Sequence, residues 1–192
     1  RVIPPFASEG TALALLIDQY GWQNVGVIFS ADDYGVLNTQ AFRNAIPEDN
    51  DVKITLTQFT PGTDSLDPQM SVLRNAVVRI IVMFPSNSED AALIIHEASR
   101  YHMIGDNFVW FGGVFASTSE VFYDERSEET DQVVKGLAKG MIGLKLKGGY
   151  GEKYENFLDI WENLDPVQYS GAGRHYASLY VAYVVDALEL FV

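Results

Sequence analysis

The chain has 192 residues, of which 47% are hydrophobic and 20% charged, as expected of a globular protein with a buried core. Its formal net charge of −13 would repel phosphate backbones and anionic lipids, which argues against nucleic-acid binding and peripheral membrane binding. The chain has no cysteine, which excludes disulfides, thiolate catalysis and Cys-ligated metal sites. It begins with Arg1 and shows neither a signal peptide nor an apolar run of membrane-spanning length, so we expect a processed or excised piece of a longer protein.

The first sixty residues alternate between helical and strand patterns. Residues 25–29 are apolar throughout, apart from one glycine, which is typical of a strand covered on both faces. The polar turn over 30–35 leads from this strand into a helix, so the two form a βα unit. The other elements expected here are an extended segment over 1–6, a buried helix over 12–20 preceded by Ser8 as N-cap, a helix over 36–46, and a half-covered strand over 52–59 near a sheet edge.

The rest of the chain continues the alternation. Residues 80–84 form the most hydrophobic strand and are placed at the centre of the sheet. The other expected elements are a short helix over 68–75, a helix capped by Ser88, a strand over 108–111, an exposed loop or frayed helix over 123–132, a strand over 141–146, and helices over 154–164 and 176–192. This order predicts an α/β fold with a largely parallel sheet flanked by helices.

Motifs of common enzymes are absent from the sequence. It has no G-x-G-x-x-G, no P-loop and no G-x-S-x-G nucleophile turn. His96 and His102 are six residues apart, so they lie on different helix faces and do not form a zinc-protease pair. Asp32 and Asp33 resemble the acidic pair of a phospho-receiver domain, but the central strand ends in Pro85 without a phosphoacceptor Asp. We therefore predict a protein without catalytic residues, metal site or cofactor.

Three loops are expected to converge where the strands end, which is where ligands bind in open α/β sheets. They cover 30–35, 84–88 and 112–117 and carry small hydroxyls, the aromatic residues Tyr34 and Phe115, and backbone amides at helix N-termini that can hold a carboxylate. This chemistry suits a small polar or zwitterionic ligand. The alternatives are that the hydroxyls cap helices, that Tyr34 packs against the following helix, and that Asp32 and Asp33 solvate a turn. The hydroxyl residues are Ser30, Ser86, Ser88 and Ser117.

Several segments together resemble the ligand-binding region of the type-1 periplasmic-binding fold. This group includes branched-chain amino-acid binding proteins, the amino-terminal domains of plant glutamate-receptor-like channels, and class C receptors. The matching segments follow one another at family-like spacing over nearly the whole chain. They are Arg1-Val2-Ile3-Pro4, Tyr20-Gly21-Trp22, 25–29 with Asp33-Tyr34-Gly35, Arg79-Ile80-Ile81-Val82, Phe108-Val109-Trp110, Phe157 with Trp161, and 183–188.

The resemblance implies two α/β lobes that close on a ligand like a clamshell. Residues 1–146 would form the second lobe, and 147–192 would belong or return to the first lobe, whose remainder is absent. The ligand contacts implied by the loops and the resemblance are Tyr34, Ser30, Asp33, Ser86, Val114 and Phe115. Glutamate-type receptors carry an acidic residue near Val114 for the ligand ammonium. Val114 cannot replace it, which leaves open a different ligand, or a lobe used for dimerisation or allostery.

The expected function is therefore a non-catalytic extracellular sensor domain of a membrane receptor, binding a small polar or amino-acid-like molecule. The expected location is the extracellular face of the plasma membrane, or the periplasm. Membrane contact would come only from parts of the protein outside this chain, and a homodimer or heterodimer is expected. The alternatives are a periplasmic solute-binding protein of a transporter and, from another class, a cytoplasmic receiver-like or other α/β enzyme domain.

Overall fold

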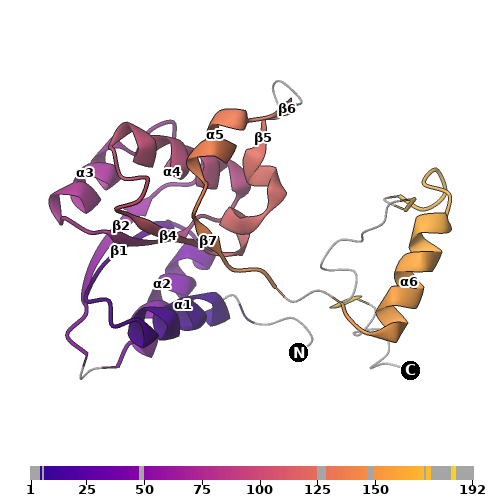
Figure 1. The fold of residues 1–192 in the computed structure, drawn as a ribbon, viewed down its shortest axis with the longest axis horizontal. Coiled ribbons are helices and arrows are strands. Elements are labelled where there is room, and N and C mark those ends of the chain that lie inside the picture. The colour runs from indigo at the N-terminus through magenta and orange to yellow at the C-terminus, as the bar shows by residue number, and fades with distance from the viewer. Residues whose placement is uncertain are drawn as a thin grey trace. The chain divides into compact units, whose positions relative to one another are not determined.

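A computed structural model of the chain describes residues 5, 7–47, 50–124, 129–146, 149–170, 172–173 and 183–184 (Figure 1). The chain divides into two compact units, and each is described by itself. The larger unit is Pro5–Lys145, and the smaller unit contains Leu146–Val192.

The larger unit is built on a parallel sheet of five strands in the order β2-β1-β3-β4-β7 (Figure 1). This arrangement confirms the predicted α/β class and fits one lobe of a periplasmic-binding-like fold. As predicted, the most hydrophobic strand is central and the half-covered strand lies at an edge. The strands are β1 (Asn24–Ser30), β2 (Lys53–Phe59), β3 (Ile80–Phe84), β4 (Val109–Gly112) and β7 (Ile142–Gly143).

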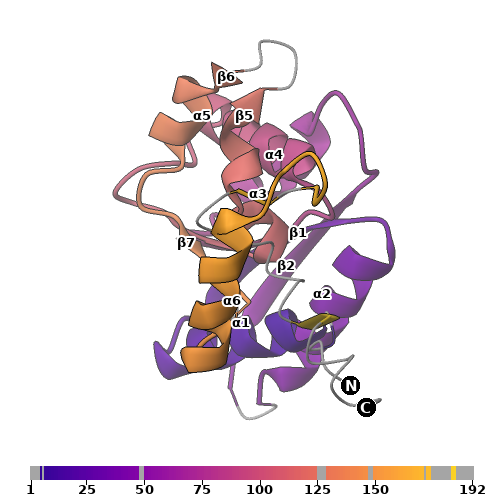
Figure 2. The ribbon, with the colours of Figure 1, turned by 90° about the vertical axis from the view of Figure 1, so that its right-hand side faces the viewer.

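Helices cover both faces of this sheet, as Figures 1 and 2 show. Successive side chains of a strand point to opposite faces. Val25 and Val27 of β1 accordingly pack in one buried cluster with residues of α1 and α2, whereas Ile28 packs in a second cluster with residues of α3 and α4. The sheet therefore has an apolar core on each side. The helices are α1 (Ala7–Gln19), α2 (Asp33–Ala45), α3 (Asp67–Asn75) and α4 (Ser88–Arg100).

Two predicted N-caps differ from those in the structure. The cap of α4 is Asn87, whose side-chain oxygen accepts a hydrogen bond from the Asp90 N–H at 2.7 Å, and Ser88 is the first helical residue. Asn87 takes the position because its backbone is extended, as a capping residue requires. Helix α1 already begins at Ala7, so Ser8 lies inside it and its hydroxyl donates to the Pro5 carbonyl.

The end of the larger unit consists of short elements. The predicted loop over 123–132 contains a small antiparallel pair of strands and the start of a helix, and β7 covers only two residues of the strand expected over 141–146. These elements are the 3₁₀ helices η1 (Val114–Ser117) and η2 (Ser119–Phe122), strands β5 (Tyr123–Asp124) and β6 (Glu129–Thr130), and helix α5 (Gln132–Leu137).

The smaller unit contains the predicted helix with aromatic residues on one face, α6 (Glu152–Asn163). The Phe157 ring stacks on Tyr154 at 6.1 Å and on Trp161 at 5.7 Å between ring centres. Most of the helix predicted over 176–192 falls outside the described residues. In the part of the chain that the structure describes, no helix is both long and apolar enough to span a membrane.

Candidate ligand-binding site

The packing of α1 on α2 brings the start of both helices to the carboxyl ends of the strands. The Gly10 N–H donates to the side-chain oxygen of Asn38 at 3.0 Å, and the Asn38 amide donates to the Tyr34 carbonyl at 3.1 Å. A Cβ atom on Gly10 would lie 2.0 Å from the Asn38 carbonyl oxygen. The two backbones can approach this closely only because residue 10 is glycine. This contact places Glu9, the neighbour of Gly10, beside Tyr34.

Glu9 joins three segments of the site through one carboxylate oxygen. Its Oε2 accepts a hydrogen bond of 2.6 Å from the Tyr34 hydroxyl and one of 2.8 Å from the Val114 N–H. Only 7% of Glu9 is exposed. Its Oε1 accepts no hydrogen bond from the described residues. Gly113 makes room for this contact, because a Cβ there would lie 2.6 Å from the Tyr34 hydroxyl oxygen and 2.9 Å from Glu9 Oε2.

The electrostatics of Glu9 follow from its burial. Burial raises the pKa of Glu9 above its ordinary value of 4.5, while the hydrogen bonds from Tyr34 and Val114 act in the opposite direction. The pKa of Tyr34 is also raised, first by burial and then by the negative charge of Glu9. Among the described residues, no basic side chain forms an ion pair with Glu9. The site therefore holds an acidic group that would gain from a positively charged neighbour.

Aromatic rings complete this part of the site. The Phe115 ring meets the Tyr34 ring edge-to-face, with 5.0 Å between the ring centres and 77° between the planes. Tyr34 is 6% exposed, Val114 is 8% exposed, and Phe115 is half-buried. The structure thus brings together the predicted residues Tyr34, Val114 and Phe115.

A second polar group surrounds Asp32, the N-cap of α2, whose Oδ1 accepts the Gly35 N–H at 3.0 Å. The buried Ser30 hydroxyl lies 2.9 Å from Asp32 Oδ1 and 3.2 Å from the Phe84 carbonyl oxygen. Burial alone would raise the pKa of Asp32, but hydrogen bonds from Gly35, Ser86 and Ser30 lower it overall. Ser30 and Ser86 therefore both hydrogen-bond to the capping side chain of α2, but neither is itself the helix cap.

The remaining predicted polar residues form no hydrogen bond with Glu9. Asp33 is exposed in the first turn of α2, and Ser88 is half-buried in the first turn of α4. The Ser117 hydroxyl donates to the Gly113 carbonyl at 2.8 Å. No group of three or more His, Asp or Glu side chains within the described residues is arranged to hold a metal ion.

Glu9 is the residue that sequence reasoning missed. It lies four residues before Leu13 and eight before Ile17, which are both buried on the face of α1 that packs on the sheet. Residues at this spacing share a helix face. An acidic residue in line with a buried apolar stripe was thus the available signal that Glu9 is not simply a solvated residue of the first helical turn.

Comparison with known proteins agrees with this architecture. The family model of the receptor family ligand binding region matches residues 1–188. The chain belongs to this family. It is 27% identical over 162 residues to the extracellular calcium-sensing receptor of Sus scrofa and 26% identical over 162 residues to that of Homo sapiens, in each case covering 82% of this chain. It is 23% identical over 159 residues, or 80% of this chain, to the glutamate [NMDA] receptor subunit 1 of Drosophila erecta. The matched region spans 14% of the length of each of these relatives.

The family match confirms the resemblance predicted from the ordered segments. The relatives are receptors by name, and the family model describes a ligand-binding region. This supports a receptor ligand-binding region over the two alternatives of a transporter's solute-binding protein and an α/β enzyme domain.

Proposed function

We propose that this chain supplies one lobe of a non-enzymatic, extracellular sensor domain that closes on a small amino-acid-like molecule carrying an ammonium group. The observation that carries the proposal is the buried carboxylate of Glu9 beside Tyr34 and Val114, at the edge of the sheet where ligands bind in open α/β folds. Val114 itself offers no charge. Glu9 supplies a carboxylate that contacts the same backbone position from a different helix.

An ammonium group at Glu9 would change the energetics of the site. A buried carboxylate without a cation loses hydration without gaining an ion pair, which is why burial raises the pKa of Glu9. A bound ammonium would favour the charged form through attraction and a charge-assisted hydrogen bond to Oε1. These interactions with Glu9 would contribute to the binding free energy of an ammonium-bearing ligand, and an uncharged analogue would lack them.

Closure would couple this binding to signalling. Residues 1–146 are proposed as the second lobe and 147–192 as part of the first, with a dimer of receptors at the extracellular face of the membrane. A ligand that contacts both lobes binds the closed state better than the open state, and it shifts the population by that difference in affinity. Val114 and Phe115 begin η1, one residue after the end of β4, and would move with the second lobe.

The test is a thermal-shift screen of the full-length protein against amino acids, the matching carboxylic acids that lack the amine, the matching amines, purines and sugars. A ligand present at a free concentration of about one hundred times its dissociation constant should stabilise the folded protein by about 2.7 kcal/mol. We expect amino acids or amines to bind and their deaminated analogues to bind much more weakly. Tyr34→Ala should abolish binding.

Glu9→Gln separates the charge from the shape of the site. Glutamine can still accept the hydrogen bonds from Tyr34 and Val114, so the fold should be kept while affinity for an ammonium-bearing ligand falls by about tenfold or more. Asp64→Asn removes a charge from an exposed loop and should leave affinity unchanged. A ligand that binds equally well to the wild type and Glu9→Gln would contradict the proposed role of Glu9, and a ligand unaffected by Tyr34→Ala would contradict the site.

A further inference from the structure

A pocket lies at the edge of the sheet opposite the Glu9 site, at the amino ends of the strands. It has a volume of about 310 Å³ and is formed by residues at the end of α3, just before β3, just after α4 and just before β4. This volume lies at the lower end of the range of about 300–1,000 Å³ that is typical of small-molecule sites. The pocket shares no residue with the Glu9 site, so an inference about it does not depend on the function proposed above.

The floor of this pocket is apolar. Val78 and Met103 line it and are almost fully buried. Phe108 also lines it and is half-buried, and the Arg79 guanidinium lies 4.6 Å from the centre of its ring. A flat apolar group could therefore rest on this floor beside a guanidinium.

The rim of the pocket is basic. Arg74, Arg79 and His102 line it, all three are exposed, and no acidic residue is among the lining residues. Within the described residues, the side chains of Arg74 and Arg79 form no hydrogen bond or ion pair. The rim is therefore a local concentration of positive charge on a chain whose formal net charge is −13.

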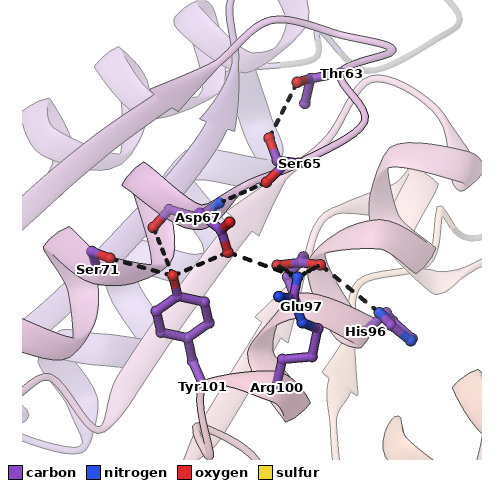
Figure 3. Close-up of polar contacts among 8 residues, drawn as sticks. All are labelled: Thr63, Ser65, Asp67, Ser71, His96, Glu97, Arg100 and Tyr101. Atoms are coloured by element: carbon purple, nitrogen blue, oxygen red, sulfur yellow. Dashed lines mark hydrogen bonds and ion pairs between the residues drawn. The ribbon is translucent and has the colours of Figure 1, made fainter.

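The neighbouring Arg100 shows the contrast, because its charge is balanced by acidic side chains (Figure 3). Its Nη1 lies 2.6 and 2.8 Å from the two carboxylate oxygens of Glu97 and 3.7 Å from Asp67 Oδ1. The Tyr101 hydroxyl lies 3.1 Å from the same Asp67 oxygen, which fixes Tyr101 as a wall of the pocket. Asp67 and Glu97 are thus engaged with Arg100 and Tyr101, whereas neither forms an ion pair with Arg74 or Arg79.

The backbone around the pocket is also unusual. Val77 and His102 both line it, and they are the non-glycine residues with positive φ in the described part of the chain, at 56° and 55°. Each follows the end of a helix, where glycine usually takes this conformation, and a β-branched residue such as valine is strongly disfavoured there. Strained residues of this kind gather at functional sites, where side-chain contacts offset the strain.

We propose that this pocket binds a small organic anion, with its carboxylate or phosphate group held by Arg74 and Arg79 and its apolar part resting on Val78, Met103 and Phe108. Guanidinium groups suit this role because their planar N–H donors match both kinds of oxyanion. Arg74 also lies in the last turn of α3, where a positive charge offsets the helix dipole. That role accounts for Arg74 alone and leaves Arg79 and the apolar floor unexplained.

Calorimetric titration of the full-length protein at constant ionic strength tests the proposal, with phenyl phosphate, benzoate, inorganic phosphate and phenol as probes. We expect saturable binding of phenyl phosphate or benzoate, tighter than that of inorganic phosphate and of phenol, and the better of the two identifies the acid group. Arg74→Gln and Arg79→Gln should each weaken that binding by about tenfold or more.

Arg43→Gln is the matched control, because Arg43 is exposed and occupies the last turn of α2 as Arg74 occupies that of α3. It should leave binding of the probe unchanged. Circular dichroism of all three variants would show whether the fold is kept. The proposal is overturned if the wild type binds neither aromatic acid saturably, if inorganic phosphate or phenol binds as tightly as they do, or if Arg43→Gln weakens binding as much as the other two substitutions.

Discussion

The two edges of the sheet carry side chains of opposite charge, which are buried at one edge and exposed at the other. At the carboxyl ends of the strands, Glu9 is buried and bound by hydrogen bonds from α2 and the loop after β4. At the amino ends, Arg74 and Arg79 are exposed at the rim of a pocket with an apolar floor. Among the described residues, neither edge provides a counter-charge for these groups.

Because of this difference in burial, the two edges are expected to differ in how far their charged residues affect folding stability as well as ligand binding. Burying a charge without a partner costs folding free energy, whereas an exposed charge remains hydrated and costs little. The Glu9 site therefore depends on tight packing and hydrogen bonds elsewhere in the larger unit. We expect substitutions at the carboxyl edge to affect stability and binding together, and substitutions at the amino edge to affect binding almost alone.

Gly10→Ala should break the carboxyl edge most severely. Its Cβ would lie 2.0 Å from the Asn38 carbonyl oxygen and 2.9 Å from the Phe42 nitrogen, and these are backbone atoms that cannot turn away. We expect a loss of about 3 kcal/mol or more in the free energy of unfolding, at the upper end for overpacking. Chemical denaturation would measure it. Gly136→Ala in α5, where a Cβ meets nothing within 4 Å, is the control and should raise stability by up to about 1 kcal/mol. Equal effects would mean that the α1–α2 contact is not tight.

Glu9→Ala should come next, with a loss of about 2 kcal/mol. It removes the acceptor for the Tyr34 hydroxyl and the Val114 N–H, and each buried donor left without a partner carries a desolvation cost. Glu9→Gln keeps an acceptor oxygen at this position and should lose much less. Chemical denaturation of the two variants would measure both losses in the free energy of unfolding. Similar losses would show that the charge of Glu9, not its hydrogen bonding, stabilises the site.

The sequence predicted the sheet well because its strands are apolar runs flanked by turns. The strands predicted over 25–29 and 80–84 correspond to β1 and β3. The loops that follow β1, β3 and β4 lie together at one edge of the sheet, as predicted. Cap positions were less certain because Asn87 and Ser88 are adjacent and both can cap a helix. The role of Glu9 depends on how closely two helices approach at Gly10, and helical periodicity does not specify that distance.

The pocket at the amino edge was beyond sequence reasoning for a related reason. Arg74 and Arg79 are separated by a turn in the chain, and His102 follows a different helix. Basic residues near the ends of helices are usual, so each has an ordinary explanation when taken alone. Only the folded chain shows that they border one pocket and that the nearby acidic residues Asp67 and Glu97 contact Arg100 instead.

The pH dependence of stability sharpens the contrast at the carboxyl edge. Because the pKa of Glu9 is raised in the folded state, the folded protein binds this proton more tightly than the unfolded chain does. Stability should therefore fall as the pH rises from 4.5 through the raised pKa, by about 1.4 kcal/mol for every tenfold difference in proton affinity between the folded and unfolded states. Glu9→Gln lacks this effect, and the lowered pKa of Asp32 acts in both proteins and cancels. Melting temperatures of the two proteins should diverge as the pH rises through this window. Parallel curves would show that Glu9 titrates normally.

Arg74→Gln should have the smallest effect on stability, a loss of about 0.5 kcal/mol or less, because an exposed charge in the last turn of a helix contributes only through the helix dipole. Arg43→Gln changes the same charge at the same position of α2 and should cost the same amount. Equal losses on denaturation would mean that Arg74 stabilises the fold no more than any basic residue at a helix end. A selective loss of anion binding in Arg74→Gln would then come from the pocket itself. A clearly larger loss of stability in Arg74→Gln would instead show that Arg74 has a structural partner. Substitutions at the amino edge would then affect stability as well as binding, as they do at the carboxyl edge.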